Sequence, residues 1–106
     1  MADALRIILE DSGYRVSIAL TGRDGIDSAL RDEFCLIITD IDLGNMTGFD
    51  VIRAVCQQKP GMYFIIITSS GSEDVLAKAR SCGAAGVLQK PFLPSEILQL
   101  IKTTLS

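Results

Sequence analysis

Hydrophobic positions recur along this chain with two different periods, and these periods predict helices and strands in alternation. Residues 3–13, DALRIILEDSG, carry apolar residues at helical spacing and end on Gly13, a residue that commonly follows the last turn of a helix. Residues 14–20, YRVSIAL, alternate apolar and polar side chains with a period of two. We therefore predict a first helix that is followed at once by a strand.

More helices are predicted along the rest of the chain. Thr21 and Ser72 are residues that cap helix N-termini, and acidic residues follow both of them in the first turn. Apolar residues at helical spacing predict a further helix from about Thr47 and a last one from about Pro94. The helix from Thr47 is expected to stop before Pro60, because the residue before proline avoids helical geometry.

Apolar runs between these helices predict strands. They cover residues 35–39 (CLIIT), 62–67 (MYFIII) and 86–89 (GVLQ). The first two runs lack alternation, which is typical of strands buried on both faces of a parallel sheet. Strands that alternate with helices form right-handed crossovers, so the predicted fold class is α/β with a doubly wound parallel sheet. We expect residues 1–106 to form one domain, because this is close to the commonest domain size and no linker interrupts the pattern.

Polar side chains follow each of these three strands. Asp40 and Asp42 come after the first apolar run, Thr68 after the second, and Lys90 after the third. Ligands of open α/β sheets bind outside the carboxyl ends of the strands. These residues are therefore expected to converge on one edge of the sheet.

This combination of side chains suits phosphoryl transfer. A carboxylate can act as a nucleophile and form an acyl phosphate. Magnesium, which prefers oxygen ligands, can neutralise the carboxylate and the incoming phosphoryl group together. Lysine offers a mobile positive charge to the phosphate, and a threonine hydroxyl can donate a hydrogen bond to a phosphoryl oxygen. Their joint placement at successive strand ends is more informative than any one of them alone.

The same residues lie in motifs that resemble the receiver domain of two-component response regulators, over nearly the whole chain. An apolar strand ends in Asp40, and Gly48 closes the turn GNMTG. The run IIITSSG ends its strand at Thr68, and GAAGVLQKPF contains the family's Lys-Pro-Phe signature at Lys90. The resemblance implies a flavodoxin-like fold and a role in a phosphorelay.

By this resemblance, Asp40 accepts a phosphoryl group from a histidine kinase or a phosphotransfer protein, and Thr68 and Lys90 assist. Asp40 and the backbone carbonyl of Asp42 are the implied Mg²⁺ ligands. The Lys90–Pro91 peptide bond is implied to be cis. The receiver is expected to act as a regulator and not as an enzyme, to stand alone because no effector domain follows Ser106, and to signal to a downstream protein that the sequence does not name.

The sequence also departs from the family pattern. Receivers begin with a strand that ends in an acidic pair, whose side chains bind Mg²⁺; aligned through Gly13 and Asp40, this strand would fall before Met1. Mg²⁺ binding is therefore expected to be weakened or absent. Gly44 stands where the family usually has proline, and Val87 where it often has an aromatic switch residue. A pseudo-receiver, which keeps the fold as a protein-interaction module without phosphorylation, is the alternative function.

The absent strand leaves a gap in the expected sheet. Residues 5–11, LRIILED, resemble a receiver's first strand with Glu10-Asp11 as the acidic pair, but the spacing of the chain after Gly13 favours a helix there. Without the strand, two apolar edges with unpaired backbone groups would flank the gap, and such edges pair with other chains. We expect either direct closure of the gap or a homodimer whose chains complete one another.

A phosphatase that uses aspartate as its nucleophile is a second class of function. The residues DID at 40–42, with a later threonine and lysine, also resemble phosphatases of the haloacid-dehalogenase type. In that family the Asp-x-Asp strand opens the core and an acidic metal-binding motif follows later. Here two predicted helices and a strand come first, and no such motif follows, so this function is disfavoured.

Composition argues against several other classes. The formal net charge is −3 and no basic run is present, which disfavours direct nucleic-acid binding. No apolar stretch approaches the roughly 20 residues that span a bilayer, and the N-terminus lacks the features of a signal peptide, so we expect a cytoplasmic protein. Cys35, Cys56 and Cys82, in a chain without histidine, predict reduced and buried thiols and no zinc site.

Overall fold

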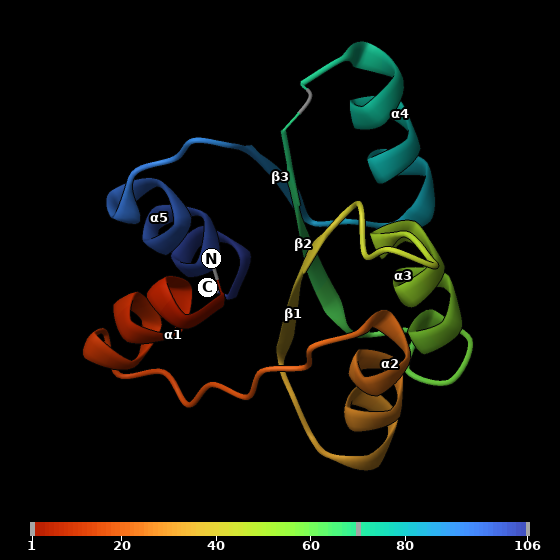
Figure 1. The fold of residues 1–106 in the computed structure, drawn as a ribbon, viewed down its shortest axis with the longest axis horizontal. Coiled ribbons are helices and arrows are strands. Elements are labelled where there is room, and N and C mark those ends of the chain that lie inside the picture. The colour runs from red at the N-terminus through yellow and green to blue at the C-terminus, as the bar shows by residue number, and fades with distance from the viewer. Residues whose placement is uncertain (1, 70, 106) are drawn as a thin grey trace.

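The computed structural model describes residues 2–69 and 71–105, and in this part of the chain a three-stranded parallel sheet lies between layers of helices (Figure 1). The strands are β1 (Leu36–Asp40), β2 (Tyr63–Thr68) and β3 (Gly86–Gln89), in that order across the sheet. Leu36 of β1 lies opposite Tyr63 of β2, and Ile65 of β2 lies opposite Gly86 of β3. The predicted α/β fold with a parallel sheet is confirmed.

Five helices occur in the described residues. They are α1 (Ala2–Asp11), α2 (Gly22–Arg31), α3 (Gly48–Cys56), α4 (Glu73–Cys82) and α5 (Pro94–Leu105). In Figure 1, α1 and α5 cover one face of the sheet, and α2, α3 and α4 cover the other. Residues 5–11 belong to α1, so the favoured helix is confirmed there and the alternative strand is wrong.

Side-chain caps and a glycine determine where several helices begin and end. The Thr21 hydroxyl accepts a hydrogen bond from the Asp24 backbone N–H at the start of α2. At α3, the Thr47 hydroxyl accepts from the Asp50 N–H while the Asp50 carboxylate accepts from the Thr47 N–H, which is a reciprocal capping box. The Thr47 N–H holds the pKa of Asp50 below its ordinary value. α4 ends at Gly83, whose φ of 92° is left-handed and suits glycine.

The core is centred on β2, which has helices on both faces. Phe64 and Ile66 join the hydrophobic cluster formed with α2, α3 and α4, whereas Ile65 joins the cluster formed with α1 and α5. All three residues are 0% exposed. Because side chains of a strand alternate between its faces, one continuous apolar run supplies both clusters.

β1 is covered less completely than the sequence predicts. Leu36, Ile37 and Ile38 are only partly buried, and Cys35, which we expected to be a buried thiol, is exposed. Among the described residues, only β2 pairs with β1, which makes β1 an edge strand. The prediction of a strand buried on both faces is therefore wrong for this run, because among the described residues no strand is paired with the edge of β1 that faces away from β2.

Residues 14–20 do not form the predicted strand. Their period-two pattern persists in the burial of the side chains, since Tyr14, Val16 and Ile18 are partly buried while the residues between them are exposed. However, two cavities of about 260 and 240 Å³ are lined by both this segment and β1. A strand needs a neighbour for its backbone groups, and none lies beside this segment among the described residues. We call the region between residues 14–20 and β1 the seam; direct closure of the gap is not observed there.

No helix in the described ranges combines the length and the apolar character needed to cross a membrane.

Candidate functional site

The carboxyl edge of the sheet carries the predicted polar residues. Asp40 is the last residue of β1, Thr68 is the last residue of β2, and Lys90 directly follows β3. The register aligns Asp40 with Ile67 and Thr68 with Gln89, so the three strand ends are level with one another. Sequence reasoning could place these residues because parallel strands end at the same edge of a sheet.

Asp40 and Lys90 are in direct contact. Lys90 Nζ lies 2.9 Å from Asp40 Oδ1, and the two side chains remain 37% and 26% exposed, respectively. A contact of this length is typical of a charge-assisted hydrogen bond. It occupies Oδ1 and leaves Oδ2 as the second oxygen of the carboxylate. The site therefore presents a carboxylate and an ammonium group together at an accessible edge.

The position of Lys90 is fixed by its own backbone. The Lys90 N–H donates to the Thr68 carbonyl at 2.8 Å, which ties the chain after β3 to the end of β2. The Lys90–Pro91 bond is cis, as the resemblance implied. Thr68 itself is 5% exposed, and it lies between the ends of β1 and β3 because β2 is the middle strand.

Asp42 lies beyond the strand, in the loop between β1 and α3. Its Oδ1 accepts a hydrogen bond from the Gly44 N–H at 3.1 Å, so the carboxylate is engaged within its own loop. Gly44 has a φ of 90°, which proline cannot adopt and which accounts for glycine at this turn. Asp42 also faces Thr47 in an isolated antiparallel bridge, which holds the loop against the start of α3.

Thr39 and Gly48 shape the backbone next to Asp40. The Thr39 hydroxyl donates to the Asp40 carbonyl oxygen at 2.9 Å, and Thr39 is buried. A Cβ atom at Gly48 would collide with the same carbonyl oxygen, so only glycine lets α3 begin so close to the strand end. Thr39 was not predicted as a site residue; a hydroxyl within an otherwise apolar run was the available signal.

The residues at this edge do not form a complete magnesium site by themselves. Within residues 2–69 and 71–105, no group of three or more His, Cys, Asp and Glu residues could hold a metal ion. Of the two predicted ligands, the Asp40 carboxylate contacts Lys90 through Oδ1. The other is the backbone carbonyl of Asp42 and not its side chain, which accepts from the Gly44 N–H. Among the described residues, this donor set is too small for a metal centre of its own.

Comparison with known sequences finds relatives for nearly the entire chain. A family model described as the response regulator receiver domain matches residues 1–102. The transcriptional regulatory protein CusR of Escherichia coli is 32% identical over 97 residues, which cover 92% of this chain and 43% of CusR. The chain therefore spans less than half the length of this curated relative.

Solved structures share the fold. A CheY-like response regulator receiver domain protein from Methanospirillum hungatei is 32% identical with a TM-score of 0.92, covering 98% of this chain and 83% of that chain. A response regulator protein from Burkholderia pseudomallei, crystallised with a phosphorylated aspartic acid, a calcium ion and citrate, is 29% identical with a TM-score of 0.86. The match covers 96% of this chain and 60% of that chain.

Proposed function

Because this chain belongs to the response-regulator receiver family of two-component signal transduction, we propose that Asp40 accepts a phosphoryl group from a histidine kinase or a phosphotransfer protein. The contact between Asp40 and Lys90 at the carboxyl edge of the sheet carries this proposal. The phosphorylated aspartic acid in the Burkholderia pseudomallei regulator supports it, because that protein shares the fold.

The geometry at Asp40 suggests how the transfer proceeds. Oδ1 is held by Lys90, so Oδ2 is the oxygen that attacks the phosphorus atom of a phosphohistidine. A P–O bond forms as the P–N bond breaks, and the imidazole leaves with the bonding electron pair and takes up a proton. The Lys90 ammonium offsets the negative charge of the phosphoryl oxygens. Thr68, the last residue of the neighbouring strand β2, carries a hydroxyl that can donate a hydrogen bond to one of them.

The proposed product is a regulatory state of the protein and not a released compound. An acyl phosphate on Asp40 replaces the carboxylate that Lys90 contacts, and it introduces phosphoryl oxygens that compete for the same ammonium group. Such a change shifts the balance between two conformations of nearly equal free energy. The downstream partner would recognise the phosphorylated conformation.

Intact-mass spectrometry after incubation with Mg²⁺ and acetyl phosphate tests the proposal. The expected result is one added phosphoryl group on the wild-type chain and none on Asp40→Asn. Asp42→Asn is the matched control and should keep the adduct, because the Asp42 carboxylate is engaged by Gly44 within the loop. An adduct that persists in Asp40→Asn would contradict the assignment of the acceptor.

A pseudo-receiver that binds partners without phosphorylation is the second candidate. One observation favours the pseudo-receiver: among the described residues, no three metal-ligating side chains lie together. The same measurement separates the two functions, since a pseudo-receiver gives no adduct with acetyl phosphate or with a phosphorylated phosphotransfer protein. Turnover of a phosphomonoester by the chain would instead support the phosphatase.

A further inference from the structure

Thr39 carries a hydroxyl group within the apolar strand β1. It follows Ile37 and Ile38, and it is 8% exposed. Because side chains alternate along a strand, Thr39 points to the same face as Ile37, which packs into the cluster with α2, α3 and α4. A hydroxyl buried on an apolar face costs free energy unless it forms a hydrogen bond, so an apolar side chain would serve packing alone better. The hydroxyl therefore indicates a role beyond packing.

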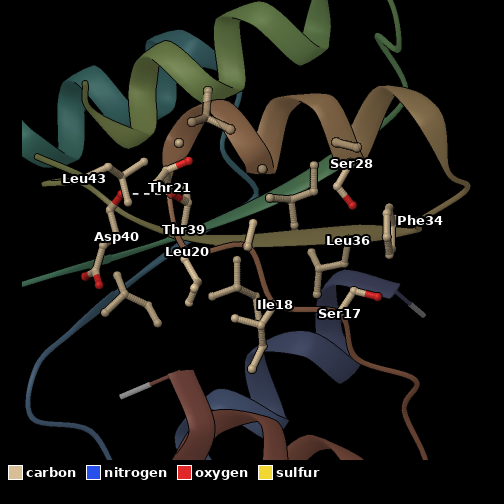
Figure 2. Close-up of a pocket in the computed structure, with 18 of the residues that line it drawn as sticks. Ser17, Ile18, Leu20, Thr21, Ser28, Phe34, Leu36, Thr39, Asp40 and Leu43 are labelled. Atoms are coloured by element: carbon tan, nitrogen blue, oxygen red, sulfur yellow. Dashed lines mark hydrogen bonds between the residues drawn. The ribbon is translucent and has the colours of Figure 1, made fainter. Parts of the chain in front are cut away.

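This hydroxyl is bound to the backbone of the proposed phosphoryl acceptor. Thr39 Oγ1 donates to the Asp40 carbonyl oxygen at 2.9 Å. Figure 2 marks this bond with a dashed line and shows the Asp40 carboxylate directed away from it. Thr39 thus acts on the main chain of Asp40 and not on its reacting oxygens.

The same peptide unit is held at its other end by β2. The peptide between Asp40 and Ile41 is planar, and its carbonyl and N–H groups point in opposite directions. The Ile41 N–H donates to the Ile67 carbonyl at 3.2 Å. The bonds from Thr39 and to Ile67 therefore act on opposite ends of one rigid plane, and together they fix its rotation about the strand.

The start of α3 packs closely against this peptide. A Cβ atom at Gly48 would collide with the Asp40 carbonyl oxygen and would lie only 3.1 Å from Thr39 Cγ2. The Gly48 N–H also donates to the next carbonyl, that of Ile41, at 2.7 Å. A rotation of the peptide after Asp40 would therefore disturb the attachment of α3 to the end of β1.

The orientation of this peptide also affects where the carboxylate lies. Lys90 is tied to β2, because its N–H donates to the Thr68 carbonyl at 2.8 Å, and its Nζ lies 2.9 Å from Asp40 Oδ1. The direction of the Asp40 side chain depends on the positions of its backbone atoms. A rotation of the peptide would therefore move the carboxylate relative to a lysine that stays in place.

We propose that Thr39 is a positioning residue for phosphoryl transfer to Asp40. Its hydroxyl fixes the peptide that follows Asp40 and thereby directs Oδ2 toward the phosphorus atom. The inference rests on the proposed function of Asp40 as the acceptor. A misplacement of a reacting group by about 1 Å can slow a reaction by about 100-fold. Loss of the Thr39 hydroxyl should therefore slow the transfer without removing any group that contacts the phosphoryl oxygens.

Initial rates of adduct formation test this inference, measured by intact-mass spectrometry with Mg²⁺ over a range of acetyl phosphate concentrations. Thr39→Val keeps the shape of the side chain and removes the donor, so the maximal rate should fall at least about tenfold without a higher half-saturating concentration. Thr39→Ser keeps the hydroxyl and should stay within about twofold of the wild type. Thr104→Val, the same change at a partly buried position on α5, is the matched control and should leave the rate unchanged.

Amide hydrogen exchange separates positioning from a general loss of stability. In Thr39→Val, exchange of the Ile41 and Gly48 N–H groups should accelerate, while exchange of residues 64–67 in β2 stays unchanged. Faster exchange throughout β2 would overturn the inference, because the slower transfer would then reflect general destabilisation.

Two kinetic outcomes would overturn the inference and leave Asp40 as the acceptor. One is an equal rate of transfer in the wild type and Thr39→Val. The other is a loss in Thr39→Ser as large as that in Thr39→Val, because the hydroxyl would then not be the group responsible. Absence of an adduct on the wild-type chain would instead overturn the proposed function, and this inference with it.

Discussion

β1 and β2 are similar apolar runs in the sequence, but their surroundings differ. Leu36, Ile37 and Ile38 of β1 stay partly accessible, while residues 64–66 of β2 are 0% exposed. β2 has a paired strand on each side, whereas β1 has one only on the β2 side among the described residues. The comparison shows that an apolar run indicates a strand, but that its neighbours determine how deeply it is buried.

The same substitution on directly paired residues measures this difference. Ile38 and Ile65 lie opposite each other and pack into the same cluster with α1 and α5. We expect Ile65→Ala to lower the free energy of unfolding by about 4 kcal/mol and Ile38→Ala by about 2 kcal/mol, since truncation costs most where the site is fully enclosed. Urea denaturation of both variants provides the measurement, and equal losses would contradict the contrast between the strands.

Local sequence signals predicted most of the fold for a physical reason. Caps such as Thr21 act on the first turn of their own helix, and strand ends such as Asp40 and Lys90 meet because parallel strands share an edge. The strand predicted at residues 14–20 failed, because pairing depends on a neighbour that the local pattern cannot reveal. The link between Thr39 and the Asp40 carbonyl was equally hidden, since it depends on side-chain geometry.

The reactivity of two cysteines provides a second comparison, between the seam and the more covered part of the molecule around α3, and its expected effect is smaller. Cys35 precedes β1, lines the seam and is exposed, while Cys56 at the end of α3 is partly buried. Burial, with a smaller contribution from Cys82, raises the pKa of the Cys56 thiol above 9.0. At pH 8, we expect a maleimide to modify Cys35 at least about tenfold faster than Cys56, because the thiolate is the reactive form.

The pH dependence of stability follows from the same raised pKa. Folding favours the protonated Cys56 thiol, so this contribution is fully present below pH 9.0 and is lost as the pH rises through the raised value. The Cys56→Ser variant should therefore lose less stability than the wild type between pH 8 and pH 11. For the maleimide prediction, peptide mapping after brief labelling gives the modification rates of Cys35 and Cys56, and preferential labelling of Cys56 would contradict its assigned burial.

The smallest expected effect concerns the contact that joins α2, beside the seam, to the loop after α3. Lys59 follows α3, and its Nζ lies 2.7 Å from the Ala29 carbonyl and 2.8 Å from the Asp32 carbonyl, at the C-terminal end of α2. A cation there satisfies the last carbonyl groups and interacts favourably with the helix dipole. We expect Lys59→Met to lower the free energy of unfolding by about 1 kcal/mol.

The helix in which hydrogen exchange accelerates distinguishes the loss of this contact from a general effect of removing a positive charge. In Lys59→Met, hydrogen exchange should accelerate in α2 and stay unchanged in α4, because the lost hydrogen bonds end on α2. Lys78→Met is the matched control: its Nζ lies 4.9 Å from the centroid of the Phe49 ring, and the loss should be only about 0.5 kcal/mol, without faster exchange in α2. If hydrogen exchange in α2 accelerated equally in both variants, the Lys59 contact would not specifically stabilise α2. The stability of this helix would then depend on its apolar contacts with α3.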